Sequence, residues 1–90
     1  MLSNYATKLS VNNNKGTVSY HDTPIVQWDD GNIILYAGGY KTNTTKKKMN
    51  QAADQFDLGY SVFQKNFEWF VEMNGMTYEF DTDEKMVLDR

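Results

Sequence analysis

The sequence predicts a small α+β domain in which an antiparallel β-sheet of about five or six strands packs on one central helix. Residues 44–58 form the one stretch with clear helical periodicity. The segments on either side alternate between apolar and polar residues and are divided by turn signals. Three strands on each side of the helix give the order βββ-α-βββ, which is compatible with one sheet or with two. Ninety residues correspond to about one domain, so residues 1–90 are assigned to a single domain.

The N-terminal segment, residues 1–15, is predicted to be a weak helix or a flexible arm, outside a core formed by residues 16–90. Leu2, Tyr5 and Leu9 fall near helical spacing, but the segment is short and ends in three asparagines. These features give the segment no strong preference for a packed element.

Three strands are expected before the helix, at residues 17–21, 25–28 and 32–37. Pro24 has no N–H group to donate to a sheet, which suits the first position of the second strand. The Asp-Gly pair that precedes Asn32 is typical of a hairpin turn. Both faces of the third strand are apolar, so this strand is predicted to lie in the centre of the sheet.

After the helix, strands are expected at residues 60–65, 67–72 and 76–80, with a further short strand possible at 86–88. Asn74-Gly75 is the strongest hairpin signal, because this pair favours the positive φ angles of a type I′ turn. Lys65-Asn66 is a second candidate for a tight turn. The predicted buried face comprises Phe67, Trp69, Val71, Met76, Tyr78 and Phe80.

The helix is predicted to begin at Thr44 or Thr45, because either hydroxyl can accept a hydrogen bond from a free N–H group of the first turn. Gly59 is the expected left-handed stop. One face of the helix carries the apolar residues at helical spacing, namely Met49, Ala52, Ala53 and Phe56.

The charges near the helix start oppose the helix dipole. Lys46, Lys47 and Lys48 are expected in the first turn, where the dipole is positive. A bound anion would reverse this unfavourable effect, because N–H groups, hydroxyls and ammonium groups would converge on it. A solvated lysine face that favours solubility is the alternative interpretation. The candidate anion site comprises Tyr40, Lys41, Thr42, Thr44, Thr45, Lys46, Lys47 and Lys48.

Nucleic acid is the natural source of a phosphate at this position, with contacts to its backbone that weaken as salt rises. Trp28, Tyr36 and Tyr40 could stack on bases, although aromatic residues at these spacings are also typical of a core. The spacing of lysine after the glycine pair does not match a Walker A motif, so nucleotide hydrolysis is unsupported.

A second hypothesis comes from the C-terminal third of the chain, which holds seven acidic residues against Lys85 and Arg90. The net charge of −3 and the pI of about 4.9 make the whole protein acidic. An acidic surface could engage a basic groove of a host protein, so that the protein would be an inhibitor or adaptor, for example one that blocks a host defence. The candidate residues are Glu68, Glu72, Glu79, Asp81, Asp83 and Glu84.

Other chemistry has little support in the sequence. The absence of cysteine removes disulfides and thiolate chemistry, and one histidine cannot complete a zinc site, so His21-Asp22 is interpreted as a turn. No cofactor, metal or enzymatic activity is therefore predicted. No stretch approaches the length of a membrane span, which favours the cytoplasm. A homodimer is possible because so short a chain buries a modest core.

The segments 20–26, 38–51 and 58–65, together with Trp69-Phe70-Val71, resemble a family of short phage and bacterial proteins. The resemblance covers roughly residues 17–88. The family motif has tryptophan after the glycine pair and arginine before Met-Asn, where this chain has Tyr40 and Lys48. Lysine lacks the bidentate fork of arginine. The resemblance implies a viral or mobile-element origin and a stand-alone domain, and it implies no biochemical activity.

Overall fold

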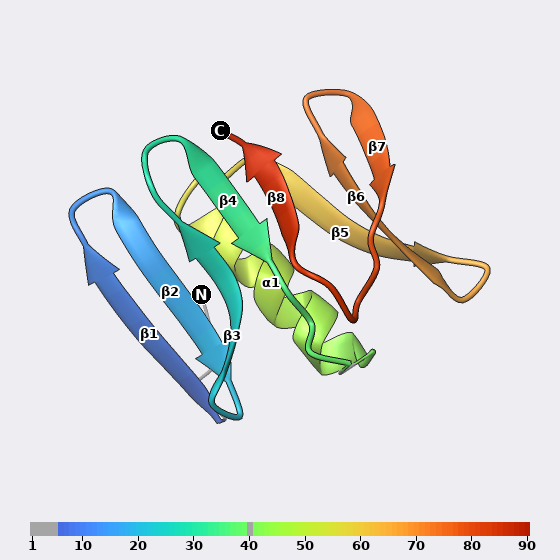
Figure 1. Ribbon diagram of the computed structural model, residues 1–90, viewed down its shortest axis with the longest axis horizontal. Helices are drawn as coiled ribbons and strands as arrows, with labels where there is room; N and C mark the ends of the chain where they lie inside the picture. The colour runs from blue at the N-terminus through green and yellow to red at the C-terminus, as the bar shows by residue number, and fades with distance from the viewer. Residues whose placement is uncertain (1–5, 40) are drawn as a thin grey trace.

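The computed structural model describes residues 6–39 and 41–90 and has eight strands around one helix (Figure 1). The predicted α+β class is confirmed, with two antiparallel sheets and the order ββββ-α-ββββ. The larger sheet has the strand order β1-β2-β3-β4-β8, and the smaller one has the order β5-β6-β7. The bounds are β1 Thr7–Asn12, β2 Lys15–Tyr20, β3 Thr23–Trp28, β4 Asn32–Leu35, α1 Asn43–Gln55, β5 Tyr60–Lys65, β6 Glu68–Met73, β7 Met76–Glu79 and β8 Met86–Asp89.

The prediction of a helix or arm in the N-terminal segment is wrong for the residues that the structure describes. Thr7–Asn12 is an edge strand, paired along its whole length with β2. The hydrogen bonds and cross-strand contacts with β2 outweigh the weak helical preference of this segment. Residues 1–5, where Leu2 and Tyr5 lie, are outside the described part of the chain.

The larger sheet covers α1 with one face, and this face carries most of the core. Val18, Val26 and Leu35 are fully buried on three successive strands. The last strand of the chain, β8, completes this sheet. It pairs with β4 and places Leu88 opposite Ile33. The tentative strand at 86–88 is therefore present, and β4 ends at Leu35, two residues earlier than expected.

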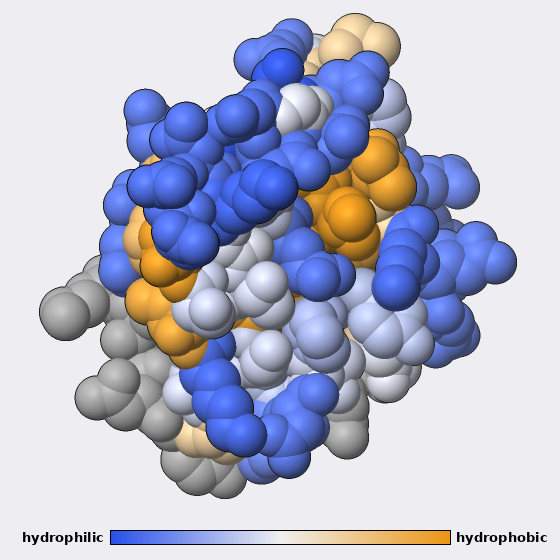
Figure 2. Space-filling view, turned by 60° about the vertical axis from the view of Figure 1, so that its left-hand side comes forward, coloured by the Kyte–Doolittle hydropathy of each residue, from blue (hydrophilic) through white to orange (hydrophobic). Residues whose placement is uncertain are grey.

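The face of the molecule in Figure 2 is mostly hydrophilic, with smaller hydrophobic patches between the polar side chains. This agrees with a sheet that buries one face only and leaves the other to solvent. On the edge strand β1, Leu9 and Val11 are almost half exposed.

The smaller sheet confirms part of the predicted buried face and corrects the rest. Trp69 and Val71 are buried, and so is Phe80. Phe67 is 92% exposed because it belongs to the turn before β6 and not to the strand. Met76 and Tyr78 are exposed at 57% and 40%, because β7 lies at the edge of its sheet where no further strand covers them.

The helix begins earlier and ends earlier than predicted. Thr42 is the N-cap, and its hydroxyl accepts a hydrogen bond from the N–H of Thr45 at 3.2 Å. At the other end Leu58 donates its N–H to the carbonyl of Ala53 at 3.0 Å. Asp57 between them has a positive φ of 54°, and Gly59 adopts φ 81° two residues further on. The predicted stripe is confirmed, with Met49, Ala52 and Ala53 buried and Phe56 partly buried against the core.

Two side-chain contacts hold the helix against the first strand of the smaller sheet. The amide of Asn50 accepts from the N–H of Val62 at 2.7 Å and donates to the carbonyl of the same residue at 2.9 Å. The hydroxyl of Tyr60 donates to the carbonyl of Met49 at 2.6 Å. Burial raises the pKa of that hydroxyl, and the charge of Asp54 adds to the effect. Asn50 thus pairs with β5 as a neighbouring strand would.

Candidate functional site

Three of the eight residues predicted to bind an anion have structural roles. The hydroxyls of Thr42 and Thr45 lie 3.1 Å apart at the helix cap, and Thr45 is fully buried. Lys48 is only 2% exposed, and its ammonium lies 5.3 Å from the centroid of the Tyr20 ring. Burial lowers the pKa of Lys48. Thr45 and Lys48 thus belong to the packing of α1, and Thr42 to its N-terminal cap.

The lysines also lie further into the helix than predicted. Because the helix begins at Asn43, Lys46 is its fourth residue and already donates its N–H to the carbonyl of Thr42 at 3.2 Å. The unfavourable effect of the dipole is strongest in the first turn and falls off beyond it. The electrostatic anomaly that suggested a bound anion is therefore weaker in the structure than in the sequence.

The other described residues of the predicted anion site are partly or fully exposed. The ammonium of Lys46 lies 5.7 Å from the centroid of the Trp69 ring and 3.5 Å from Oε1 of Gln64, so it is partly engaged. Lys41, Thr44 and Lys47 are exposed. Tyr40 lies outside the described residues.

The acidic candidates contribute to a cavity of about 370 Å³ at one end of the smaller sheet. Glu68 at the start of β6, Glu79 at the end of β7 and Asp81 in the following turn all line it. Lys41, from the predicted anion site, lines the same cavity. The two hypotheses thus meet at one place, where three carboxylates stand against one ammonium.

The cavity also has a polar group that lacks a partner. Thr82 is 3% exposed and lines the cavity. Within the described part of the chain, its hydroxyl is the buried side-chain polar atom left without a hydrogen bond. A buried hydroxyl without a partner is unfavourable by about 1–3 kcal/mol.

The rest of the cavity wall is aromatic. Trp69 and Phe80 are buried with their ring centroids 6.2 Å apart, and Phe67 stands at the rim. The backbone here is held by the N–H of Phe80, which donates to the carbonyl of Trp69 at 2.9 Å, and by the N–H of Gly39, which donates to the carbonyl of Thr82 at 3.2 Å. Such a site combines negative charge with aromatic surface on a fixed backbone.

The other three acidic candidates lie outside the cavity wall. Glu72 is exposed on β6, in register with Ser61 and Thr77. Asp83 and Glu84 are exposed in the turn after Thr82, where the N–H of Asp83 donates to the carboxylate of Asp81 at 3.0 Å. The six predicted residues are therefore split into three at the cavity and three beside it.

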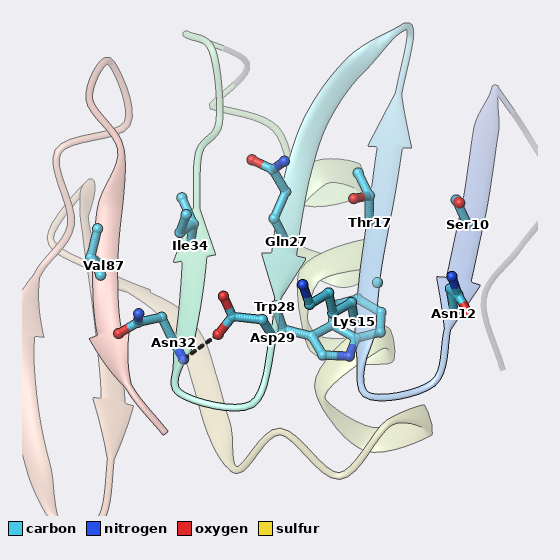
Figure 3. Close-up of a pocket in the computed structure, with 11 residues that line it drawn as sticks. Ser10, Asn12, Lys15, Thr17, Gln27, Trp28, Asp29, Asn32, Ile34 and Val87 are labelled. Atoms are coloured by element: carbon cyan, nitrogen blue, oxygen red, sulfur yellow. Dashed lines mark hydrogen bonds between the residues drawn. The ribbon is translucent and has the colours of Figure 1, made fainter.

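A second hollow lies on the outer face of the larger sheet, away from α1 (Figure 3). Its volume is about 360 Å³, and it is an open, mainly polar sheet surface. Asp29 at one end accepts hydrogen bonds from the N–H groups of Gly31 and Asn32 at 2.9 and 2.8 Å, which lower the pKa of its carboxyl. One row of side chains crosses all five strands, namely Ser10, Thr17, Gln27, Ile34 and Val87.

The described residues hold neither a metal-binding cluster nor a membrane-spanning helix. They contain no group of three or more histidine, cysteine or acidic side chains that could hold a metal ion. None of their helices is long and apolar enough to cross a membrane. The turn predicted at His21-Asp22 is present, with both residues at positive φ and Asp22 paired with Lys8 at 2.7 Å.

The structure defines the chain as a small α+β protein with two antiparallel sheets around one helix and an acidic, aromatic-lined cavity. The chain belongs to the Kyanoviridae Gp96 protein family, a family of cyanophage proteins whose model matches residues 1–87. The phage origin implied by the sequence resemblance is thereby confirmed. No curated protein and no solved structure has significant similarity to the chain.

Sequence reasoning missed two parts of the site, Phe67 and Thr82. Thr82 gave no signal, because only the fold shows that it is buried without a partner. Phe67 did give one. It follows Asn66 between two strands in the position that glycine occupies after Asn74. An Asn-Phe turn where the chain elsewhere uses Asn-Gly could have drawn attention to this residue.

Proposed function

We propose that this phage protein is a non-enzymatic binding protein whose acidic cavity engages a basic side chain of a host protein in the cytoplasm. The observation that carries the proposal is the gathering of Glu68, Glu79 and Asp81 around one cavity with an aromatic wall. Carboxylates are hydrogen-bond acceptors, which suits a ligand that brings positive charge and N–H donors.

The charge around the cavity favours a basic protein over a phosphate. Among the described residues, Lys41 is the one basic residue in the cavity wall, and three carboxylates share that wall with it. A phosphate placed there would meet more negative than positive charge. The overall net charge of −3 acts in the same direction, since it attracts basic partners over distances of about a Debye length.

Charge reversal in the cavity tests this function. The double variant Glu79→Lys/Asp81→Lys is expected to reduce recovery of a host protein partner at least about tenfold, because like charges then face the basic group. The partner is first captured from host-cell lysate on the wild-type protein and identified, and its affinity for each variant is then measured with purified proteins.

The matched control is Glu72→Lys/Glu84→Lys, which changes the net charge by the same amount at exposed positions outside the cavity wall. This control is expected to keep binding within about threefold of the wild type, since neither side chain lines the cavity and exposed charges are screened by salt. If both double variants lose the partner equally, binding follows overall charge and the cavity is not the site.

Nucleic acid remains a second candidate because Thr44 and Lys47 are exposed and line a hollow of about 350 Å³ with Asn43 at the helix start. This candidate predicts binding to duplex or single-stranded DNA or RNA that falls steeply as salt rises. Lys47→Ala should then weaken binding and reduce the salt dependence by about one phosphate contact. Lys48 is unsuitable for this test because it is buried. Absence of binding at low salt would exclude this candidate.

A further inference from the structure

We propose that the basic group taken by the acidic cavity is a single arginine side chain, and that Phe67 is the platform on which its guanidinium stacks. This inference rests on the proposed function and names the ligand of the same site. It starts from Phe67, a residue whose place in the fold is locally unfavourable.

The backbone at Phe67 is in the left-handed region, with φ 67°, after Asn66 with φ 52°. Two successive positive φ angles are those of a type I′ hairpin turn, whose second position favours glycine. The chain follows this rule at Asn74 and Gly75, which have φ values of 53° and 79°. A bulky side chain in this conformation is a true outlier.

The ring of Phe67 makes no packing contribution to the fold that would offset this strain. It is 92% exposed, so it buries almost no apolar surface. The neighbouring aromatic pair of the sheet is complete without it, since Phe63 and Phe70 stack with centroids 5.5 Å apart. A strained and exposed aromatic residue at the rim of a cavity is consistent with a role in binding.

Arginine fits this surface better than lysine. The guanidinium is planar, stacks on aromatic faces, and donates in a fork that can reach more than one carboxylate. It is also more weakly hydrated than an ammonium, which lowers the unfavourable desolvation on entry into the cavity. Phe67 offers the aromatic face, and Glu79 with Asp81 offers the carboxylates.

Thr82 contributes to the wall of the same cavity, but its hydroxyl is buried away from solvent and is not counted among the groups that meet the ligand. The geometry thus separates a rim that stacks from a wall that carries charge.

The test titrates N-acetyl-arginine amide into the ¹⁵N-labelled full chain at low salt, with N-acetyl-lysine amide as the comparison. The expected result is a dissociation constant in the millimolar range for the arginine probe and binding about fivefold weaker for the lysine probe. Shifts should centre on the Trp69 indole and the amides of residues 79–82. Equal binding of the two probes, or shifts centred elsewhere, would overturn the proposal.

Two variants at Phe67 separate binding from folding. Phe67→Gly and Phe67→Ala are both expected to weaken the arginine probe by about two- to fivefold, because both remove the ring. Only Phe67→Gly relieves the left-handed strain, so it alone should raise the melting temperature, by about 2–6 °C. Unchanged affinity in both variants would remove Phe67 from the site.

If a host partner still depends on Glu79 and Asp81 while the arginine probe does not bind, the inference fails and the proposed function stands.

Discussion

Replacing Asn50 by alanine is expected to lower the free energy of unfolding by about 3 kcal/mol. The substitution removes the acceptor for the N–H of Val62 and the donor to its carbonyl, at 2.7 and 2.9 Å. Val62 is 2% exposed, so solvent has little access to replace these bonds, and each group left unpaired is unfavourable by about 1–3 kcal/mol. Urea unfolding followed by tryptophan fluorescence measures the loss, which is a large part of the about 5–13 kcal/mol expected for a domain of this size.

Asn50→Asp sharpens this test. The carboxylate can still accept from the N–H of Val62, but it repels the carbonyl to which the amide donated. Protonation restores a donor, and burial beside a carbonyl raises the pKa of the new carboxyl, so the native state binds the proton more tightly than the unfolded state. The loss relative to wild type should therefore be smaller at pH 3 than at pH 7. A loss below about 1 kcal/mol in Asn50→Ala would show that Asn50 does not stabilise β5.

The second large effect is expected at Gly16, where alanine should destabilise the protein by about 3 kcal/mol. An added Cβ would overlap the six-membered ring of Trp28, its cross-strand neighbour on β3. The indole cannot move away freely, because it is buried and packs on Phe56 with centroids 4.8 Å apart. Overpacking of a filled core is unfavourable by about 1–3 kcal/mol, and displacement of a tryptophan lies at the upper end.

Thermal unfolding followed by circular dichroism measures this effect. The melting temperature of Gly16→Ala should fall by about 12–24 °C, given about 4–8 °C per kcal/mol for a domain of this size. Gly31→Ala is the matched control, since an added Cβ there would meet only a carboxylate oxygen of Asp29 at 3.9 Å and the backbone has no positive φ. Similar losses in both variants would exclude the contact with Trp28 as the cause.

The structure changes which residues of the helix start are available to a partner. Thr42 caps the helix, Thr45 is buried beside it, and Lys48 lies under the larger sheet. The cap lies two or three residues earlier than the sequence suggested, which turns Thr42 into the capping residue. Lys48 precedes Ala52 by four residues, so any helix that contains both places Lys48 on the same side as the buried stripe.

The sequence predicts the acidic residues as one group, but their arrangement in space depends on the fold. Glu68 and Glu79 come from different strands, and Asp81 follows in a turn, so only strand pairing brings them to one cavity. The class of partner, a basic protein or a nucleic acid, is a proposal that the fold alone does not test. A cavity defines the chemistry that it can accept, and a binding experiment identifies the molecule that enters it.

The sequence by itself determined the α+β class, the helix with its buried stripe, and most of the strands, because each depends on the periodicity of neighbouring residues. Tertiary structure alone decided that Thr7–Asn12 is a strand, that β8 joins β4, and that Phe67 faces solvent. These features depend on contacts between residues distant in the chain, or on turn geometry that strand pairing imposes. Local patterns do not contain that information.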